Sequence, residues 1–225
     1  MDQQYVIIVA GGKGSRMQSN TPKQFIEING EALIVRTIKA FLNYNSLIKI
    51  IISVHKDFKV YLEELLLKHG LNKNNIQITL GGETRFQSVK NGLSLIEDQN
   101  AIVGIHDAAR PFVSIQTIKT CFDTAKEKGN ATPFVFLTDT IRKVDGQFNS
   151  SVDRSLFRII QTPQCFLASK IKDAFAQEYN PIFTDDASVL EYNGEKINLV
   201  EGNIENIKIT TQFDLSIAKT LLTNE

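Results

Sequence analysis

The sequence lacks most of the features that mark secreted or membrane-spanning proteins. Its 225 residues include only two cysteines, Cys121 and Cys165, which lie far apart and form no CxxC or zinc-like spacing. A disulfide framework is therefore not expected, and a reducing cytoplasm is favoured. No apolar run reaches the roughly 18–20 residues that a membrane-spanning helix needs, and no basic stretch precedes the apolar run near the N-terminus, as a signal peptide would require. We expect a soluble, cytoplasmic protein.

An excess of charge of either sign is also missing. Twenty-five basic residues balance 25 acidic ones, so the formal net charge is zero. Proteins that bind nucleic acid usually carry a basic excess, because contacts to phosphates supply most of that affinity. We therefore expect neither a nucleic-acid nor a membrane partner, whereas a small phosphorylated ligand needs only a few cations. No repeat or Pro/Gly/Ser-rich linker divides the chain, so a single domain over residues 1–225 is expected.

Short apolar runs alternate with amphipathic stretches. The apolar runs predict buried strands at 5–10, 48–54, 76–80, 101–106 and 132–137, with a further extended segment at 197–200. Helical periodicity predicts helices at 32–43, 57–69, 85–97, 115–128, 168–177, 186–192 and 211–222. This alternation indicates an α/β fold with a Rossmann-like, mostly parallel sheet flanked by helices. Such sheets bind ligands beyond the carboxyl ends of their strands.

Residues 138–160 interrupt the alternation. Asp145-Gly146 stands between two extended runs, and this pair predicts a β-hairpin whose two turn positions both have positive φ. A hairpin inserted into a parallel sheet often projects as an arm, although a simple surface excursion would look the same in the sequence.

The first predicted strand runs directly into a glycine-rich turn that reads AGGKGSRM over residues 10–17, followed by Pro22-Lys23-Gln24. Three glycines let the backbone approach a phosphate, and Arg16 and Lys23 could balance the charge of a triphosphate. The turn is not a Walker A loop, and the dinucleotide fingerprint GxGxxG fails because Met17 replaces the third glycine. A tight turn would need glycine anyway, but the two cations favour phosphate binding.

Two further motifs follow predicted strands. GGETRFQS at 81–88 leads into a helix that begins near Thr84, and it suits either an anion site or simply a tight turn with a helix cap. HDAARP at 106–111 places Asp107 where a carboxylate could meet a hydrated Mg²⁺ ion. Arg110 could instead be the structural ion-pair partner of Asp107, and we interpret His106 as a packed residue rather than a base.

Downstream candidates are weaker when each is considered alone. Thr140 and Arg154 flank the predicted hairpin, and Thr162 lies in QTPQ. The Asp185-Asp186 pair could cap a helix, and Lys208 could be a solvated surface residue.

Together, however, these strings closely resemble the methylerythritol phosphate cytidylyltransferases of the non-mevalonate isoprenoid pathway. AGGKGSRM with PKQ, GGETRFQSV, HDAARPF, VDRSLF, QTPQ, TDDAS and EGNIENIKIT occur in this order, so that the likeness extends from Val6 to about Ala218. The resemblance implies a nucleotide-diphospho-sugar transferase type of fold. It also implies that CTP and 2-C-methyl-D-erythritol 4-phosphate react to give 4-diphosphocytidyl-2-C-methyl-D-erythritol and pyrophosphate.

The resemblance also implies residue roles. Arg16 and Lys23 match the pair that stabilises the transition state at the α-phosphate, and Arg154 and Lys208 match the pair that positions the acceptor phosphate. The CTP side is matched by Ala10, Gly11, Gly12, Gly14, Gly82 and Ser88. The acceptor side is matched by Arg110, Thr140 and Thr162, and Asp107 matches a residue near magnesium. The family is a homodimer whose hairpin arms cross, which implies that Thr140 and Arg154 serve the neighbouring subunit's site.

Some positions depart from the family, and other functions compete with this one. Gly11 and Glu83 stand where some members carry alanine and aspartate. A ribitol-5-phosphate cytidylyltransferase is the nearest alternative, but Ala108-Ala109 replaces the serine-valine pair expected there. A non-catalytic CTP-binding module of the same fold is a second alternative, and a nicotinamide-dependent oxidoreductase is a third.

Overall fold

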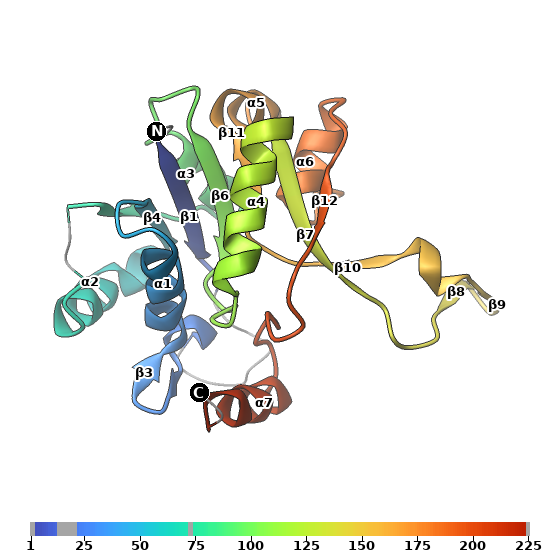
Figure 1. The fold of residues 1–225 in the computed structure, drawn as a ribbon, viewed down its shortest axis with the longest axis horizontal. Coiled ribbons are helices and arrows are strands. Elements are labelled where there is room, and N and C mark those ends of the chain that lie inside the picture. The colour runs from blue at the N-terminus through green and yellow to red at the C-terminus, as the bar shows by residue number, and fades with distance from the viewer. Residues whose placement is uncertain (1–2, 13–21, 72–73, 224–225) are drawn as a thin grey trace.

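The fold is built on one large mixed sheet (Figure 1). The computed structural model describes residues 3–12, 22–71 and 74–223. The strand order is β10-β7-β11-β6-β1-β4-β5, with β12 beside β7. The strands are β1 (Gln4–Ala10), β4 (Lys49–Val54), β5 (Ile76–Leu80), β6 (Ile102–Asp107), β7 (Asn130–Phe136), β10 (Arg158–Ile160), β11 (Gln164–Leu167) and β12 (Leu199–Glu201).

The strand directions confirm the predicted mostly parallel sheet and add two antiparallel strands to it. β1 pairs in parallel with β4 and with β6, and β4 pairs in parallel with β5. β11 runs antiparallel between β6 and β7, and β10 is antiparallel to β7. All five strands predicted in the first two thirds of the chain are present, but β10 and β11 were not predicted. Each is only a few residues long, and an apolar run this short shows no recognisable periodicity in the sequence.

Helices cover both faces of the sheet (Figure 1). They are α1 (Leu33–Tyr44), α2 (Lys59–Lys68), α3 (Arg85–Leu93), α4 (Ile115–Lys128), α5 (Ala168–Ala174), α6 (Asp186–Tyr192) and α7 (Gln212–Thr223). None of the helices formed by the described residues is long and apolar enough to cross a membrane.

The prediction that a helix extends from 85 to 97 is wrong at its end. α3 stops at Leu93, and the amides of Leu95 and Ile96 donate to carbonyls three residues earlier. Ile96 nevertheless is fully buried, so the apolar pattern continued after the helix had ended. Apolar periodicity reports burial, and here a turn rather than a helix buries the last residue.

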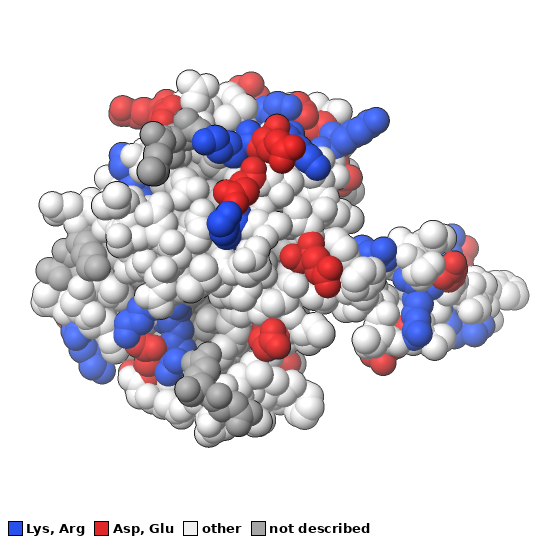
Figure 2. Space-filling model, viewed as in Figure 1, with Lys and Arg blue, Asp and Glu red and all other residues white. Residues whose placement is uncertain are grey.

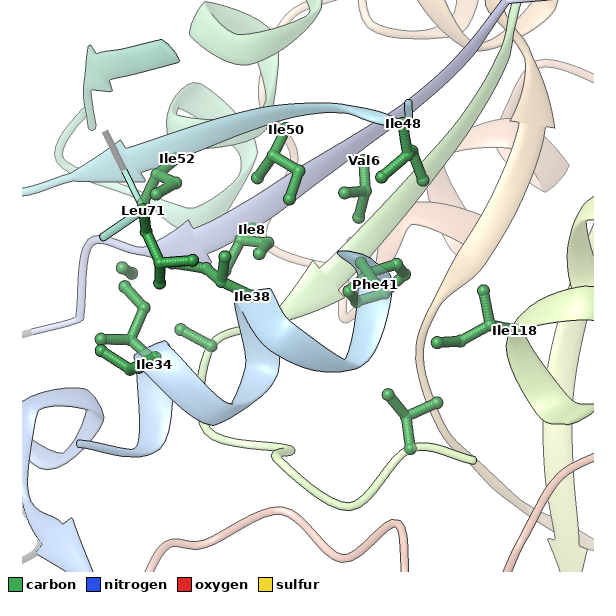
Figure 3. Close-up of a cluster of buried hydrophobic side chains, with 14 of the residues drawn as sticks. Val6, Ile8, Ile34, Ile38, Phe41, Ile48, Ile50, Ile52, Leu71 and Ile118 are labelled. Carbon is green, nitrogen blue, oxygen red and sulfur yellow. The ribbon is translucent and has the colours of Figure 1, made fainter. Parts of the chain in front are cut away.

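Alternation along β1 builds the two cores. Val6 and Ile8 face α1, α2 and α4, where they pack with Ile38 and Phe41 (Figure 3). Tyr5 and Ile7 face the opposite side, which α3, α5 and α6 cover. Because successive side chains of a strand point to opposite faces, a strand covered on both sides reads as one continuous apolar run. This is why β1, in the middle of the sheet, could be predicted from the sequence.

The hairpin is present, but its turn differs from the prediction. It consists of β8 (Arg142–Asp145) and β9 (Phe148–Ser151), which lie on an arm extending from the body (Figure 1). Asp145 pairs with Phe148, so the two-residue turn is Gly146-Gln147 rather than Asp145-Gly146. Gly146 has φ +57° and Gln147 has no positive φ, so only one turn position needs the left-handed region. A glycine followed by an ordinary residue is typical of a type II′ turn.

The C-terminal segment returns to the middle of the sheet. The Ile209 amide donates to the Ala109 carbonyl at 2.9 Å, which brings residues 201–210 beside the end of β6. The predicted capping box at the start of α7 is confirmed, because Asp214 Nα donates to the Thr211 hydroxyl and Asp214 Oδ2 accepts from the Thr211 amide. α7 packs through Leu215 and Ala218 against Ile28 and Leu33. The neighbouring short strands are β2 (Glu27–Ile28) and β3 (Glu31–Ala32).

Candidate active site

The carboxyl ends of β1, β5 and β6 surround one cavity of about 190 Å³. Parallel strands place their carboxyl ends at the same edge of the sheet, so motifs far apart in the chain meet there. The lining residues are Val9, Ala10, Gly11, Gly12, Lys23, Gln24, Gly82, Glu83, Thr84, Arg85, Ser88, Asp107, Ala108, Ala109 and Lys208. A second cavity, of about 490 Å³, shares the two glycine turns and extends toward His55 and Lys56.

Gln24 braces the first glycine turn. Its Nε2 donates to the carbonyls of Ala10 at 2.7 Å and of Gly12 at 3.2 Å, and its side chain is almost fully buried. Gln24 is the middle residue of the 3₁₀ turn Lys23–Phe25, so the same hydrogen bonds help to place Lys23 at the cavity. Gln24 belongs to the PKQ motif, and no role is predicted for it from the sequence. Arg16 and Gly14 lie outside the described residues.

The second glycine turn is shaped by the start of α3. Thr84 and Gln87 form a capping box, which confirms the predicted helix start. The Ser88 hydroxyl accepts from the Gly82 amide at 3.1 Å and donates to the Thr84 carbonyl at 2.9 Å. A Cβ on Gly82 would lie 2.3 Å from Gln87 Cβ, and one on Gly11 would lie 3.0 Å from Ser88 Oγ. Gly11 therefore allows the first turn to approach Ser88, and Gly82 leaves room for the Gln87 side chain of its own turn.

Asp107 is the electrostatic centre of the cavity. Its Oδ2 lies 2.9 Å from Lys208 Nζ and 3.3 Å from Arg110 Nε, and its Oδ1 lies 3.6 Å from Arg85 Nε. Burial alone would raise the pKa of Asp107, but the three cations hold that pKa well below its usual range. Asp107 is therefore an anion within a cationic pocket that suits phosphate groups.

Thr162 and His106 form a chain of hydrogen bonds that includes the backbone amide of Asp107. The Asp107 amide donates to Thr162 Oγ1 at 3.1 Å, Thr162 Oγ1 lies 3.0 Å from His106 Nδ1, and His106 Nε2 lies 3.0 Å from the Arg110 carbonyl. A carbonyl only accepts, so Nε2 carries the proton, Nδ1 accepts, and the Thr162 hydroxyl donates. Burial lowers the pKa of His106 to about 4, so that the ring is neutral near pH 7. His106 is a packed residue, as interpreted from the sequence.

The segment that ends at Lys208 is held in place by buried polar groups. Arg110 Nη1 donates to the Asn206 carbonyl at 2.9 Å, and Asn206 Nδ2 donates to the Thr162 carbonyl at 2.8 Å. Arg110 thus contacts both Asp107 and the C-terminal segment, which makes it an ion-pair partner rather than a cavity-lining residue.

The two neighbouring aspartates have different partners. Asp185 caps α6, as expected, by accepting from the Ser188 amide. Asp186 instead forms two hydrogen bonds with Arg85, Nη1 to Oδ1 at 2.7 Å and Nη2 to Oδ2 at 2.6 Å. Asp186 is fully buried. No local pattern in the sequence indicates that Arg85 and Asp186 meet.

Thr140 and Arg154 are not brought to this cavity. Both are exposed on the arm, and the Arg154 guanidinium donates to the Thr138 carbonyl. Figure 2 shows basic side chains on the projecting arm, which also carries acidic groups.

Metal-binding groups are sparse in the part of the chain that the structure describes. It contains no group of three or more histidine, cysteine, aspartate or glutamate side chains that could hold a metal ion by themselves. A larger cavity of about 540 Å³ lies elsewhere, between α1, the start of α4 and α7. Its cations Arg36 and Lys39 are both paired with Glu31, and neither the glycine turns nor Asp107 line this cavity.

Two glycine turns and a carboxylate at the carboxyl ends of parallel strands define an α/β protein of the nucleotidyltransferase type. Comparison with known proteins supports that class. A crystal structure of 4-diphosphocytidyl-2C-methyl-D-erythritol synthase from Anaerococcus prevotii superposes with a TM-score of 0.84 at 28% identity, covering 99% of this chain and 96% of the other.

Sequence comparison defines the family. The family profile of 2-C-methyl-D-erythritol 4-phosphate cytidylyltransferase matches residues 4–224. The chain is 42% identical over 220 residues to the protein of that name from Bacteroides thetaiotaomicron, covering 98% of this chain and all of the other. It is 45% identical over 216 residues to the one from Bacteroides fragilis, covering 96% and 98%. The chain belongs to the 2-C-methyl-D-erythritol 4-phosphate cytidylyltransferase family.

Proposed function

We propose that this protein transfers CMP from CTP to 2-C-methyl-D-erythritol 4-phosphate, releasing pyrophosphate, in non-mevalonate isoprenoid biosynthesis. The observation that carries the proposal is the Asp107–Lys208 pair at 2.9 Å, set between two glycine turns at one cavity. The family's name supports the identity of the substrates.

The chemistry requires positioning and charge rather than a general base. An oxygen of the acceptor phosphate attacks the α-phosphorus of CTP, and the bond to the β-phosphate oxygen breaks to release pyrophosphate. The acceptor phosphate is already an anion at neutral pH, so no proton has to be removed. Because two anions must approach, cations lower the barrier. We propose that Arg16 and Lys23 stabilise the α-phosphate in the transition state and that Lys208, with Arg154, positions the acceptor.

We propose that Mg²⁺ is the cofactor and that Asp107 helps to bind it. Mg²⁺ commonly binds one or two carboxylates together with substrate phosphates, and it rarely uses a cage made only of protein groups. The two carboxylates that line this cavity, Asp107 and Glu83, fit that pattern. When bound, the ion would neutralise charge on the phosphates. Ala10, Gly11, Gly12, Gly14, Gly82 and Ser88 would contact CTP, and Arg110, Thr140 and Thr162 would serve the acceptor side.

We also propose a homodimer in which the arms exchange. The arm exposes apolar side chains that have little contact with the body, including Phe148 at 82% and Leu156 at 78% exposure. Arg154 lies on this arm, outside the cavity of its own chain. A second copy that covers the arm would bury this apolar surface and bring Arg154 to the partner's cavity.

Mixing two inactive variants tests the exchange. Arg154→Ala and Lys208→Ala should each lose activity alone. Unfolding and refolding them together should restore about a quarter of the wild-type rate, because half the dimers are mixed and each has one intact site. No recovery, or a monomer by sedimentation velocity, would contradict arm exchange.

The buried thiols of Cys121 and Cys165, both free, support our proposal that the protein works in the reducing cytoplasm.

Pyrophosphate release from CTP and Mg²⁺ tests the activity itself. The acceptors 2-C-methyl-D-erythritol 4-phosphate and ribitol 5-phosphate are offered separately. Release with the first alone is expected. Release with ribitol 5-phosphate alone would preserve the reaction type and overturn the acceptor, and CTP binding without release would favour a non-catalytic CTP-binding module.

A further inference from the structure

We propose that Asp186 is a positioning residue for the transfer reaction: its two-point contact holds Arg85 away from Asp107, so that Asp107 Oδ1 stays open toward the cavity. The idea rests on the proposed cytidylyl transfer, for which Asp107 is the central carboxylate. Asp186 itself does not line the cavity and acts only through Arg85.

The distances show which aspartate holds the guanidinium. Asp186 accepts from both Arg85 Nη atoms at 2.6 and 2.7 Å, whereas Asp107 Oδ1 lies 3.6 Å from Arg85 Nε. The first contact is a bidentate, charge-assisted pair, and the second is too long for a hydrogen bond. Arg85 lines the cavity, so its position decides how the cationic charge is distributed there.

Asp186 is buried at the start of one helix and contacts Arg85 at the start of another. Its side chain has no exposed surface, and it occupies the first position of α6, while Arg85 occupies the first position of α3. α5 and α6 cover the same face of the sheet as α3, and the three helices share a core that contains Phe86 and Val189. The carboxylate and the guanidinium therefore meet at the starts of two helices that pack in one core.

Asp185 shows that the contact is not merely helix capping. Asp185 supplies the cap of α6 by accepting from the Ser188 amide at 2.9 Å. Its other oxygen accepts from Gln164 Nε2 at 2.7 Å, and Gln164 Oε1 accepts from the Ala187 amide at 2.8 Å. The start of α6 is therefore satisfied without Asp186, whose carboxylate is left to contact Arg85.

Among the described residues, Asp107 is the other carboxylate that forms an ion pair with Arg85, at 3.6 Å from its Nε. Removing one partner of a buried ion pair leaves the other charge uncompensated, which is costly. A shift of the guanidinium toward Asp107 would reduce that cost. Arg85 would then close on Asp107 Oδ1 and occupy the side of Asp107 that faces the cavity. The reacting phosphates would lose the open carboxylate, while the glycine turns that are expected to hold CTP would stay in place.

The test compares Asp186→Asn with Asp185→Asn, which removes the same charge one residue away and keeps a good capping side chain. Asp186→Asn should lower kcat by about 10- to 100-fold, as for other residues that orient a catalytic group, with KM for CTP unchanged. Asp185→Asn should keep the wild-type kcat. The double variant Arg85→Gln/Asp186→Asn should have the kcat of Arg85→Gln alone, because Asp186 acts through Arg85. Independent losses in the double variant would overturn the proposal.

Two further measurements keep the proposal testable. If Asp186→Asn does not fold, Arg85→Lys retains the charge but lacks the planar fork, and it should show the same fall in kcat at unchanged KM for CTP. A crystal structure of Asp186→Asn should place Arg85 within hydrogen-bond distance of Asp107 Oδ1. If the wild type releases no pyrophosphate, the proposed function fails. The crystal structure of Asp186→Asn still tests whether Asp186 holds Arg85 away from Asp107. An unmoved Arg85 would overturn it.

Discussion

Acidification should destabilise this protein well above the pH at which carboxylates titrate, because His106 is buried as a neutral ring. Its side chain is fully buried, and burial lowers its pKa from 6.5 to about 4. Both ring nitrogens are already committed, Nδ1 to the Thr162 hydroxyl and Nε2 to the Arg110 carbonyl. A second proton on the ring would face the Thr162 hydroxyl, whose own proton already occupies that contact.

The direction in which stability changes with pH follows from whether the folded or the unfolded state binds more protons. Below the ordinary pKa of histidine the unfolded chain takes up a proton that the folded protein takes up only near pH 4. The stabilisation is therefore complete above about pH 6.5 and is lost as the pH falls toward 4. Since each pH unit between the two pKa values corresponds to about 1.4 kcal/mol, going from about pH 7.5 to about 4.5 should remove roughly 2.5 kcal/mol.

Urea unfolding across this range, with EDTA present to exclude metal effects, measures the slope. Wild type should lose about 1.2 kcal/mol per pH unit near pH 5.5. His106→Asn should be less stable at neutral pH and should show a much flatter dependence, because the titrating group is gone. His55→Asn, which keeps a polar acceptor near the surface, should retain the wild-type slope. A flat wild-type profile, or an unchanged slope in His106→Asn, would refute the reasoning.

Two further predictions concern the cavity. Gly82→Ala should destabilise the protein by about 1–3 kcal/mol in urea unfolding and weaken CTP binding in calorimetry, because the new Cβ would lie 2.3 Å from Gln87 Cβ. Gly146→Ala, where the added Cβ meets no atom within 4 Å but the backbone has positive φ, should reduce stability without affecting CTP binding. Lys208→Gln should lower kcat by about 100-fold or more, as the loss of one charge-stabilising contact does, with little change in Tm because Arg85 and Arg110 still face Asp107. A Lys208→Gln variant with wild-type kcat would remove Lys208 from the mechanism.

The site was only partly predictable from the sequence. Ala10, Gly11, Gly82 and Asp107 each follow a strong apolar strand, and parallel strands bring their carboxyl ends together, so their meeting at one cavity was expected. Lys208 was different, because as a single residue it suited a solvated surface position equally well. Its contact with Asp107 depends on the backbone bond from Ile209 to Ala109, which no local pattern indicates.

Local sequence by itself determined the strands of the parallel half of the sheet, the glycine turns that follow them and the starts of α3 and α7. These features depend on residues within one turn or one strand of each other. Tertiary structure alone decided that Arg85, Arg110 and Lys208 surround one carboxylate and that Asp186 contacts Arg85 from 101 residues away. It also decided the short antiparallel strands β10 and β11. Contacts of this kind arise when helices and loops that are distant in the chain pack side by side on the sheet, and their geometry leaves no period in the sequence.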